Sequence, residues 1–133
     1  MTTPLIFDSH ALLKFFQQET GAASVEKWLR IAQRRRWGKY LCAINLGEII
    51  YMTKRQFGDQ QKIAVLAHIH RLKFIILPVA NELIFEAAEY KAEYSISYAD
   101  CFVLACAVRH AATIVTGDPE FRKVNHLAKI HWV

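Results

Sequence analysis

Short apolar runs alternate with segments of helical spacing along the whole chain. Four runs have the length and composition of buried strands, namely residues 5–7, 40–44, 74–77 and 113–116, and residues 129–133 form a weaker fifth. Between them, apolar residues recur every three or four positions, which predicts helices over residues 11–16, 25–32, 46–57, 62–72, 82–94 and 98–111. Strands that alternate with helices are typical of a mostly parallel sheet covered on both faces. We therefore predict an α/β fold, a three-layer α/β/α sandwich with four or five strands.

Length and composition favour one domain over residues 1–133. The chain has 133 residues, 53% hydrophobic and 22% charged, with neither an internal repeat nor a Pro/Gly-rich linker. The first apolar stretch is too short for a signal peptide and lacks a basic flank. No apolar run approaches the roughly 18 residues that a membrane span needs. We expect a soluble, cytoplasmic protein with no membrane association.

The cysteines and the net charge give little information about function. The chain has three cysteines, Cys42, Cys101 and Cys106, which lie among apolar neighbours. Because their number is odd and their spacing matches no zinc-ligand pattern, we expect them to be small buried hydrophobic residues. The net charge of +5 mildly favours a polyanionic partner such as nucleic acid.

Four of the twelve acidic residues are unlike surface acids. Asp8 follows PLIF, Glu48 lies in INLGEIIYM, Asp100 begins the apolar run of SYADCFVLA, and Asp118 follows TIVTG. Each also has a structural interpretation. Asn45 with Glu48, and Ser97 with Asp100, have the spacing of capping boxes, Asp8 could cap the first helix, and Asp118 could stabilise a turn.

The predicted sheet brings the four acids to one place. Asp8, Glu48 and Asp118 follow the ends of parallel strands, and Asp100 opens a helix that runs back antiparallel to the next strand, so all four are expected at the carboxyl edge. Two unit charges roughly 4 Å apart repel by about 4 kcal/mol at an effective dielectric of about 20. Helix N-termini offset only about 0.3–1 kcal/mol each. A divalent cation would offset the remaining repulsion between the acids. Ligands that are all oxygen atoms favour Mg²⁺ or Mn²⁺ over Zn²⁺.

The segments around these acids are IFDSHALL (6–13), NLGEIIY (45–51), SYADCFVLACA (97–107) and IVTGDPEF (114–121). Their order and spacing resemble the PIN-domain ribonucleases, and most closely the VapC-type toxins of toxin–antitoxin pairs. The resemblance implies a parallel sheet between helices and a Mg²⁺ or Mn²⁺ site formed by Asp8, Glu48, Asp100 and Asp118. It also implies that Ser9 and Thr116 support the site through hydrogen bonds. His10 departs from the small or polar residue that is common in the family, and is expected to be a local packing or surface histidine.

The resemblance implies metal-assisted hydrolysis of RNA phosphodiester bonds, a cognate antitoxin and a homodimer. Asp8 and Asp100 are the first candidates for direct ligands, whereas Glu48 and Asp118 could bind metal, hold a water or transfer protons. Lys14, Arg122 and Lys123 follow these acids closely and are candidate phosphate contacts. The basic segment 34–39 precedes a strand, which places it at the opposite edge, where we expect it to be solvated or part of a partner surface.

Two other functions are compatible with a fold of this class. One is a catalytically idle RNA- or protein-binding module on the same scaffold, which the complete set of four acids disfavours. The other is a phosphatase or receiver-like Mg²⁺ enzyme, which is disfavoured because no D-x-D-x-T/V motif follows the first strand.

Overall fold

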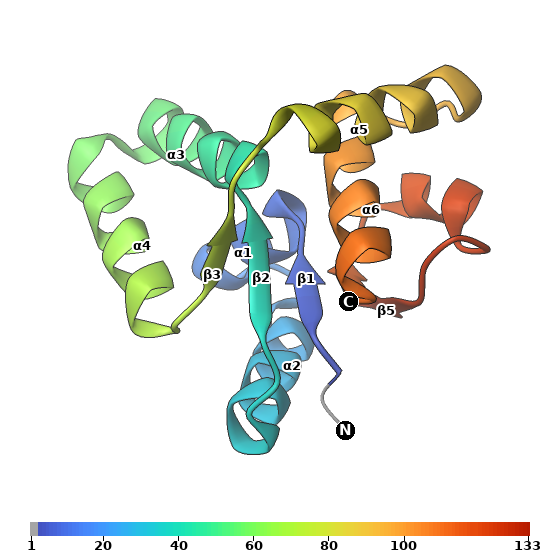
Figure 1. Cartoon of the computed structure of the whole chain (residues 1–133). Coiled ribbons are helices and arrows are strands. Elements are labelled where there is room, and N and C mark those ends of the chain that lie inside the picture. Colours follow the sequence, from blue (N-terminus) through green and yellow to red (C-terminus); the bar gives the residue numbers. More distant parts are fainter. Residues whose placement is uncertain (1–2) are drawn as a thin grey trace.

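The computed structural model of the chain describes residues 3–133, and its path alternates between strands and helices (Figure 1). The strands are β1 (Leu5–Phe7), β2 (Lys39–Cys42), β3 (Ile75–Leu77), β4 (Thr113–Thr116) and β5 (Ile130–Trp132). The helices are α1 (Ser9–Phe16), α2 (Ala22–Arg35), α3 (Ala43–Phe57), α4 (Asp59–Arg71), α5 (Asn81–Glu93) and α6 (Tyr98–His110). A 3₁₀ helix, η1 (Pro119–Val124), connects β4 to the last strand.

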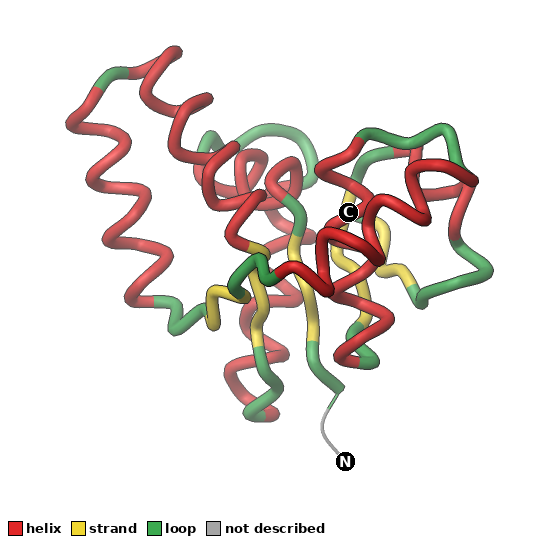
Figure 2. The backbone as a smooth tube through the Cα atoms, turned by 45° about the horizontal axis from the view of Figure 1, so that its top comes forward, coloured by secondary structure: helices red, strands yellow, loops and turns green. Residues whose placement is uncertain are grey.

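The five strands form one sheet in the order β3-β2-β1-β4-β5, and every neighbouring pair is parallel. Helices flank the sheet, as the two views in Figures 1 and 2 show. The predicted α/β architecture is therefore confirmed, and the weak fifth strand is present. Because all strands point the same way, their carboxyl ends share one edge of the sheet, the carboxyl edge, and their amino ends share the opposite amino edge.

Successive residues of the central strand β1 face opposite sides of the sheet. Ile6 packs into a core with apolar side chains of α5 and α6, including Phe102. Phe7 packs into a second core with α1–α4, to which Leu12 and Ile49 belong. All of these side chains are at most 4% exposed. The alternation that identified the strand thus divides the core into two halves and produces the three layers.

The largest shift in an element boundary between strand and helix lies at the start of α3. We expected a strand over 40–44 and a helix from residue 46, whereas β2 ends at Cys42 and α3 begins at Ala43. Cys42 is extended, with φ −67° and ψ 140°, and serves directly as the helix N-cap, so no loop separates the elements. As a result, Asn45 lies inside the first turn of the helix rather than ahead of it.

Other helices begin earlier than their apolar spacing predicts, because helix ends are polar and carry no periodic signal. α2 runs from Ala22 to Arg35, although apolar spacing covers only 25–32. α4 begins at Asp59, three residues before the predicted start, directly after Gly58. Gly58 has a φ of 89°, which ends α3 and is readily adopted only by glycine.

The three cysteines are buried and free, as predicted for small hydrophobes. None of the helices within residues 3–133 is sufficiently long and apolar to cross a membrane.

Candidate active site

Asp8 lies at the carboxyl edge, directly after β1, and caps α1. Its side chain is 1% exposed, and its Oδ1 accepts a hydrogen bond of 2.8 Å from the backbone N–H of Ala11. Its Oδ2 accepts a hydrogen bond from the hydroxyl of Thr116. Burial raises the pKa of Asp8 to about 6, although both hydrogen bonds and the charge of the exposed His10 lower it. The nearby charge of Asp118 adds a smaller upward shift.

Thr116, the last residue of β4, links two of the acids. Its side chain is fully buried, and its Oγ1 accepts a 3.0 Å hydrogen bond from the backbone N–H of Asp118. A hydroxyl has a single proton, and here that proton is donated to Asp8. The hydroxyl that the family resemblance assigns to the site is therefore in direct contact with the first acid.

Asp118 and Asp100 reach the same place from different segments. Asp118 caps η1, with its Oδ1 accepting a 2.9 Å hydrogen bond from the N–H of Glu120. Asp100 lies in the first turn of α6, where its N–H donates a 3.1 Å hydrogen bond to the hydroxyl of the N-cap residue Ser97. Figure 1 shows that α6 begins toward the end of the sheet to which β1 points. The predicted antiparallel return of this helix thus places its head at the carboxyl edge.

Asp8, Asp100 and Asp118 form an acid cluster that is largely withdrawn from water. Asp100 is 8% exposed, and burial is the largest cause of a rise in its pKa to about 8. The charges of Asp118 and Asp8, and a side-chain hydrogen bond with Asp118, raise this pKa further. Asp100 therefore holds its proton to a higher pH than an isolated carboxyl group does, as expected where carboxylates repel one another away from water.

Glu48 lies beside the acid cluster but is not one of the charges that shift the pKa of Asp8 or of Asp100. Its Oε1 accepts two hydrogen bonds of 3.0 Å, from the hydroxyl of Ser9 and from the side-chain amide of Asn45. Ser9 is the residue next to Asp8, so it connects Glu48 to the cluster. The structure thus brings three of the four predicted acids together and holds the fourth at their side.

Asn45 is the residue that the sequence analysis did not place in the site. We weighed the pair Asn45 and Glu48 as a capping box, and this is wrong, because the N-cap of α3 is Cys42. The two residues instead face each other one turn apart inside the helix. Asn45 is 1% exposed and orients Glu48, and within residues 3–133 its Oδ1 has no hydrogen-bond partner. The i, i+3 spacing of an amide and an acid was the available signal.

The capping roles expected of Asp8 and Asp118 are confirmed, and of the capping box at Ser97 and Asp100 the bond to the serine hydroxyl is present. Asp8 caps α1, Asp118 caps η1, and Ser97 caps α6 through the backbone of Asp100. Capping fixes these side chains in place at the edge where they meet.

The donors of the acid cluster fit a divalent cation in kind, although they do not form a finished metal cage. Within the described part of the chain, no three His, Cys, Asp or Glu side chains are already arranged as a metal-binding group. Asp8, Asp100 and Asp118 nevertheless offer only carboxylate oxygens, the ligands that Mg²⁺ and Mn²⁺ prefer. A cation would also relieve the repulsion that raises the pKa of Asp100.

Lys14 lies near this edge. Gly117, between Thr116 and Asp118, has no room for a Cβ, because the Nζ of Lys14 and the backbone oxygen of Val133 occupy that space. The ammonium group of Lys14 thus lies against the turn that carries Asp118.

The other two candidate phosphate contacts are engaged elsewhere. Lys123 donates hydrogen bonds to Glu120 at 2.7 Å and to the backbone oxygen of Ser95 at 2.9 Å. The guanidinium of Arg122 lies over the ring of Trp132, 5.8 Å from its centre. Both are exposed, and within residues 3–133 neither forms a hydrogen bond or an ion pair with the acid cluster.

Comparison with known proteins points to one family. The PIN domain family matches residues 5–127 of the chain. Comparison with curated proteins finds no match.

Several solved structures share the fold at low sequence identity. VapBC2 from Rickettsia felis, bound to a DNA fragment from its promoter, has a TM-score of 0.80 and 16% identity, covering 97% of this chain and 98% of that one. A toxin–antitoxin complex from Klebsiella pneumoniae has a TM-score of 0.69 and 17% identity, covering 97% and 99%. VapC20 from Mycobacterium tuberculosis, a toxin that cleaves the sarcin–ricin loop, has a TM-score of 0.67 and 13% identity, covering 83% and 86%.

Proposed function

Since the chain belongs to the PIN domain family, we propose that it is a Mg²⁺- or Mn²⁺-dependent endoribonuclease and the toxin of a toxin–antitoxin pair. The proposal assigns Asp8, Asp100, Asp118 and Glu48 to the active site. Solved proteins with this fold that are described as toxins or toxin–antitoxin complexes support it.

One observation carries the proposal, namely the gathering of three carboxylates from distant segments, two of which are buried. Asp8 and Asp100 are 1% and 8% exposed, and mutual charge as well as burial raises the pKa of Asp100. Such an arrangement is costly for folding, and a bound divalent cation turns it into a stabilising one. A fold selected only for stability would have no use for it.

Asp8 and Asp100 would hold the cation, with Asp118 and Glu48 as further ligands or as holders of a water molecule. When bound, a divalent cation supplies positive charge for the phosphate oxygens and lowers the pKa of a water molecule. Thr116 and Ser9 keep Asp8 and Glu48 in position through their hydroxyl groups. Lys14 contacts a non-bridging phosphate oxygen and favours the bound substrate.

The reaction is in-line attack of water on the RNA phosphorus. The bond from phosphorus to the 3′ oxygen breaks, which leaves a 5′-phosphate and a 3′-hydroxyl. One carboxylate of the site takes a proton from the attacking water, and that proton passes on through solvent to the leaving 3′ oxygen. Glu48 and Asp118 are the acids for this transfer, and Glu48 has a second carboxylate oxygen, Oε2, for which the described residues provide no hydrogen bond.

The toxin assignment also implies protein partners. Large apolar side chains are exposed on α3 and α4, and Tyr51, Phe57 and Ile63 are 48%, 50% and 62% exposed. Apolar side chains gathered on neighbouring helices favour a protein interface. We infer a homodimer and a cognate antitoxin whose tail covers the acid cluster.

The test is RNA cleavage by the purified protein in Mn²⁺ or Mg²⁺. Asp8→Asn and Asp100→Asn each remove a ligand charge and should abolish cleavage while the circular dichroism spectrum stays native. The matched control is Glu89→Gln, because Glu89 is an exposed acid of α5 that lies on the solvent side of the helix. It should cleave as the wild type does.

Two results would contradict the proposal. Full cleavage in excess EDTA, or in both Asp8→Asn and Asp100→Asn, would exclude the metal mechanism. For the toxin role, induced expression of the wild type should arrest growth, and co-expression of the protein encoded by an adjacent short reading frame should restore it. Unimpaired growth with the wild type alone would count against toxicity, and mapping of the cleaved RNAs would identify the substrate.

A further inference from the structure

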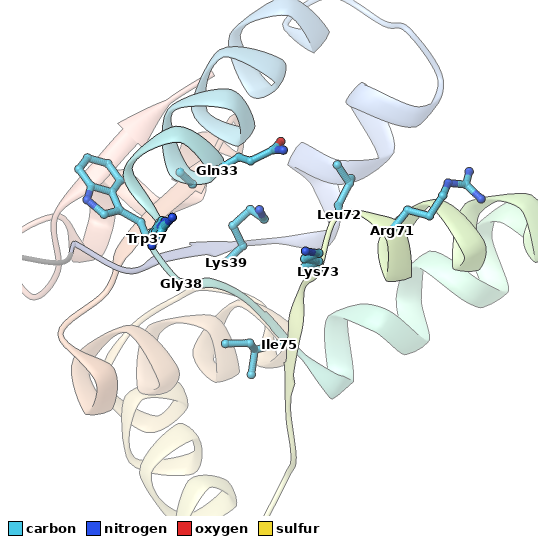
Figure 3. Close-up of a pocket in the computed structure, with 10 residues that line it drawn as sticks. Gln33, Trp37, Gly38, Lys39, Arg71, Leu72, Lys73 and Ile75 are labelled. Atoms are coloured by element: carbon cyan, nitrogen blue, oxygen red, sulfur yellow. The ribbon is translucent and has the colours of Figure 1, made fainter.

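A second polar site lies at the amino edge of the sheet, at the other end of the strands from the acid cluster (Figure 3). It is a pocket of about 410 Å³ between the end of α2, the start of β2 and the turn after α4. We call it the basic pocket, after the lining residues Arg36, Lys39, Arg71 and Lys73. Trp37 forms part of its wall.

The positive charges of the basic pocket are not neutralised by the protein. No Asp or Glu lines it. Among residues 3–133, none of its four cationic side chains forms an ion pair, whereas lysines and arginines elsewhere pair with acids at 2.6–3.3 Å. The pocket is therefore a concentrated positive field with room for a ligand.

Lys39 is the most informative of the four cations because it is buried. The residue is only 8% exposed, and Figure 3 shows its side chain rising from β2 between Gln33 and Lys73. Its backbone is held in the sheet opposite Leu5, so the side chain cannot swing out with a loop. Burial, with a smaller effect of the charge of Lys73, lowers the pKa of Lys39. Withdrawing most of a charged side chain from water, with no acid to pair with it, is costly for folding.

Helix dipoles explain only part of this arrangement. Arg71 is the last residue of α4 and Arg36 is the C-cap of α2, positions where a positive charge is favoured by about 0.3–1 kcal/mol. Lys39 belongs to a strand and has no such explanation. We expected segment 34–39 to be solvated or part of a partner surface; Arg36 is exposed, whereas Lys39 is buried and so is not solvated.

We propose that the basic pocket binds the phosphate group of a small phosphorylated ligand of about nucleotide size. A phosphate monoester carries about two negative charges and three acceptor oxygens, which suits four cations better than a single carboxylate does. The volume of about 410 Å³ falls in the range of small-molecule sites and exceeds what a bare phosphate fills. Leu72 and Ile75 also line the pocket and offer apolar surface for the remainder of the ligand. The proposal does not rest on the ribonuclease function.

Two kinds of ligand carry such a phosphate group, namely a free nucleotide and the 5′-phosphate end of an RNA. Calorimetric titration of the full chain with inorganic phosphate, AMP and adenosine, at constant ionic strength, tests the phosphate requirement. Phosphate and AMP should bind and adenosine should not. Titration in EDTA with an oligoribonucleotide bearing a 5′-phosphate, and with its 5′-hydroxyl form, distinguishes the sources. Tighter binding of the 5′-phosphorylated RNA than of AMP would assign the pocket to an RNA end, and equal or weaker binding would assign it to a free nucleotide.

Two variants of the basic pocket and one control assign the binding to its residues. Lys39→Met and Lys73→Asn should each weaken the binding of AMP about tenfold, the loss expected for one charge-assisted hydrogen bond. Lys27→Met, which removes an exposed lysine of α2 outside the pocket, should bind as the wild type does. In the absence of phosphate, Lys39→Met should also have a higher Tm than the wild type, because it removes a charged side chain that is mostly withdrawn from water and has no acid partner.

The inference is overturned if phosphate, AMP and the 5′-phosphorylated RNA all fail to bind, or if both pocket variants bind them as tightly as the wild type. Lys73→Asn decides the matter if Lys39→Met does not fold. Lys73 is exposed and has a φ of 60°, a conformation that asparagine adopts readily, so this variant should retain the native fold.

Discussion

Replacing Asp8 by asparagine should abolish the proposed activity and at the same time stabilise the metal-free protein. Asp8 is 1% exposed, and burial is the main reason that its pKa is raised. Asparagine has nearly the same shape and carries no charge. Its side-chain oxygen can still accept from Ala11, and its amide can donate to Thr116 where the carboxylate accepted.

The magnitude follows from the pKa of Asp8, which rises from 3.8 to about 6 on folding. A carboxyl with a raised folded-state pKa holds its proton more tightly in the folded chain, so its contribution to stability is complete below pH 3.8 and is lost as the pH rises through about 6. About two pKa units correspond to about 3 kcal/mol. Altered hydrogen bonds in the variant cost about 1 kcal/mol, so Asp8→Asn should gain about 2 kcal/mol above pH 6.

The assay is urea unfolding in EDTA at a series of pH values from below 4 to 8. The free energy of unfolding of the wild type should fall with rising pH relative to that of Asp8→Asn, while the exposed-acid control Glu89→Gln should follow the wild type. Added Mg²⁺ should stabilise the wild type and leave Asp8→Asn nearly unchanged. If Asp8→Asn is no more stable than the wild type at pH 8 in EDTA, the charge of Asp8 is not costly and the main argument for a cation at this edge fails.

Three further variants examine the residues around the acids. Thr116→Val removes the hydrogen bond that lowers the pKa of Asp8. Losing about 1 kcal/mol of stabilisation of the charged carboxylate should move the acidic limb of the pH–activity profile up by roughly 0.7 pH units. Thr116→Ser keeps the hydroxyl and should leave the limb in place. Asn45→Ala removes one of the two hydrogen bonds to Glu48, so kcat should fall several-fold with KM unchanged. The comparison variant is Asn45→Asp, which keeps the shape of the side chain but adds a charge that repels Glu48. Lys14→Met should raise the KM for RNA about tenfold and reduce the salt dependence of binding, measured by fluorescence anisotropy in EDTA; an unchanged salt slope would mean that Lys14 does not contact phosphate.

The position of the acid cluster could be predicted because it depends on few structural facts. Asp8 and Asp118 each follow a short buried run, and the carboxyl ends of parallel strands share an edge whatever the order of the strands. Asp100 follows an N-cap serine and precedes an apolar helix, so its own position required only that this helix run antiparallel to the strands. The fold class and the edge were therefore accessible without knowing how the helices pack.

Features that depend on packing between segments could not be predicted. The start of α3 decides whether Asn45 lies ahead of the helix or inside it. Because β2 passes directly into α3 without a loop, no turn residues in the sequence mark the boundary between strand and helix. Lys123 follows Asp118 closely in sequence, yet its ammonium group is taken up by Glu120 and Ser95. Lys39 appears in the sequence as one of several basic residues, and only the pairing of β2 with β1 shows that it is buried.

Capping and a metal site are often weighed as alternatives for an acid at a helix start, but in this protein their energies differ. A capping side chain contributes about 1 kcal/mol to stability, and capping needs neither burial nor neighbouring acids, since serine or asparagine serves equally well. Burying Asp8 as a charged group costs about 3 kcal/mol by its raised pKa, and the repulsion within the cluster adds to this cost at Asp100. Capping therefore explains why the side chains of Asp8 and Asp118 are held in place, but it is too weak to explain why Asp8 and Asp100 are buried carboxylates that lie next to Asp118. A ligand that requires negative charge at this edge explains both.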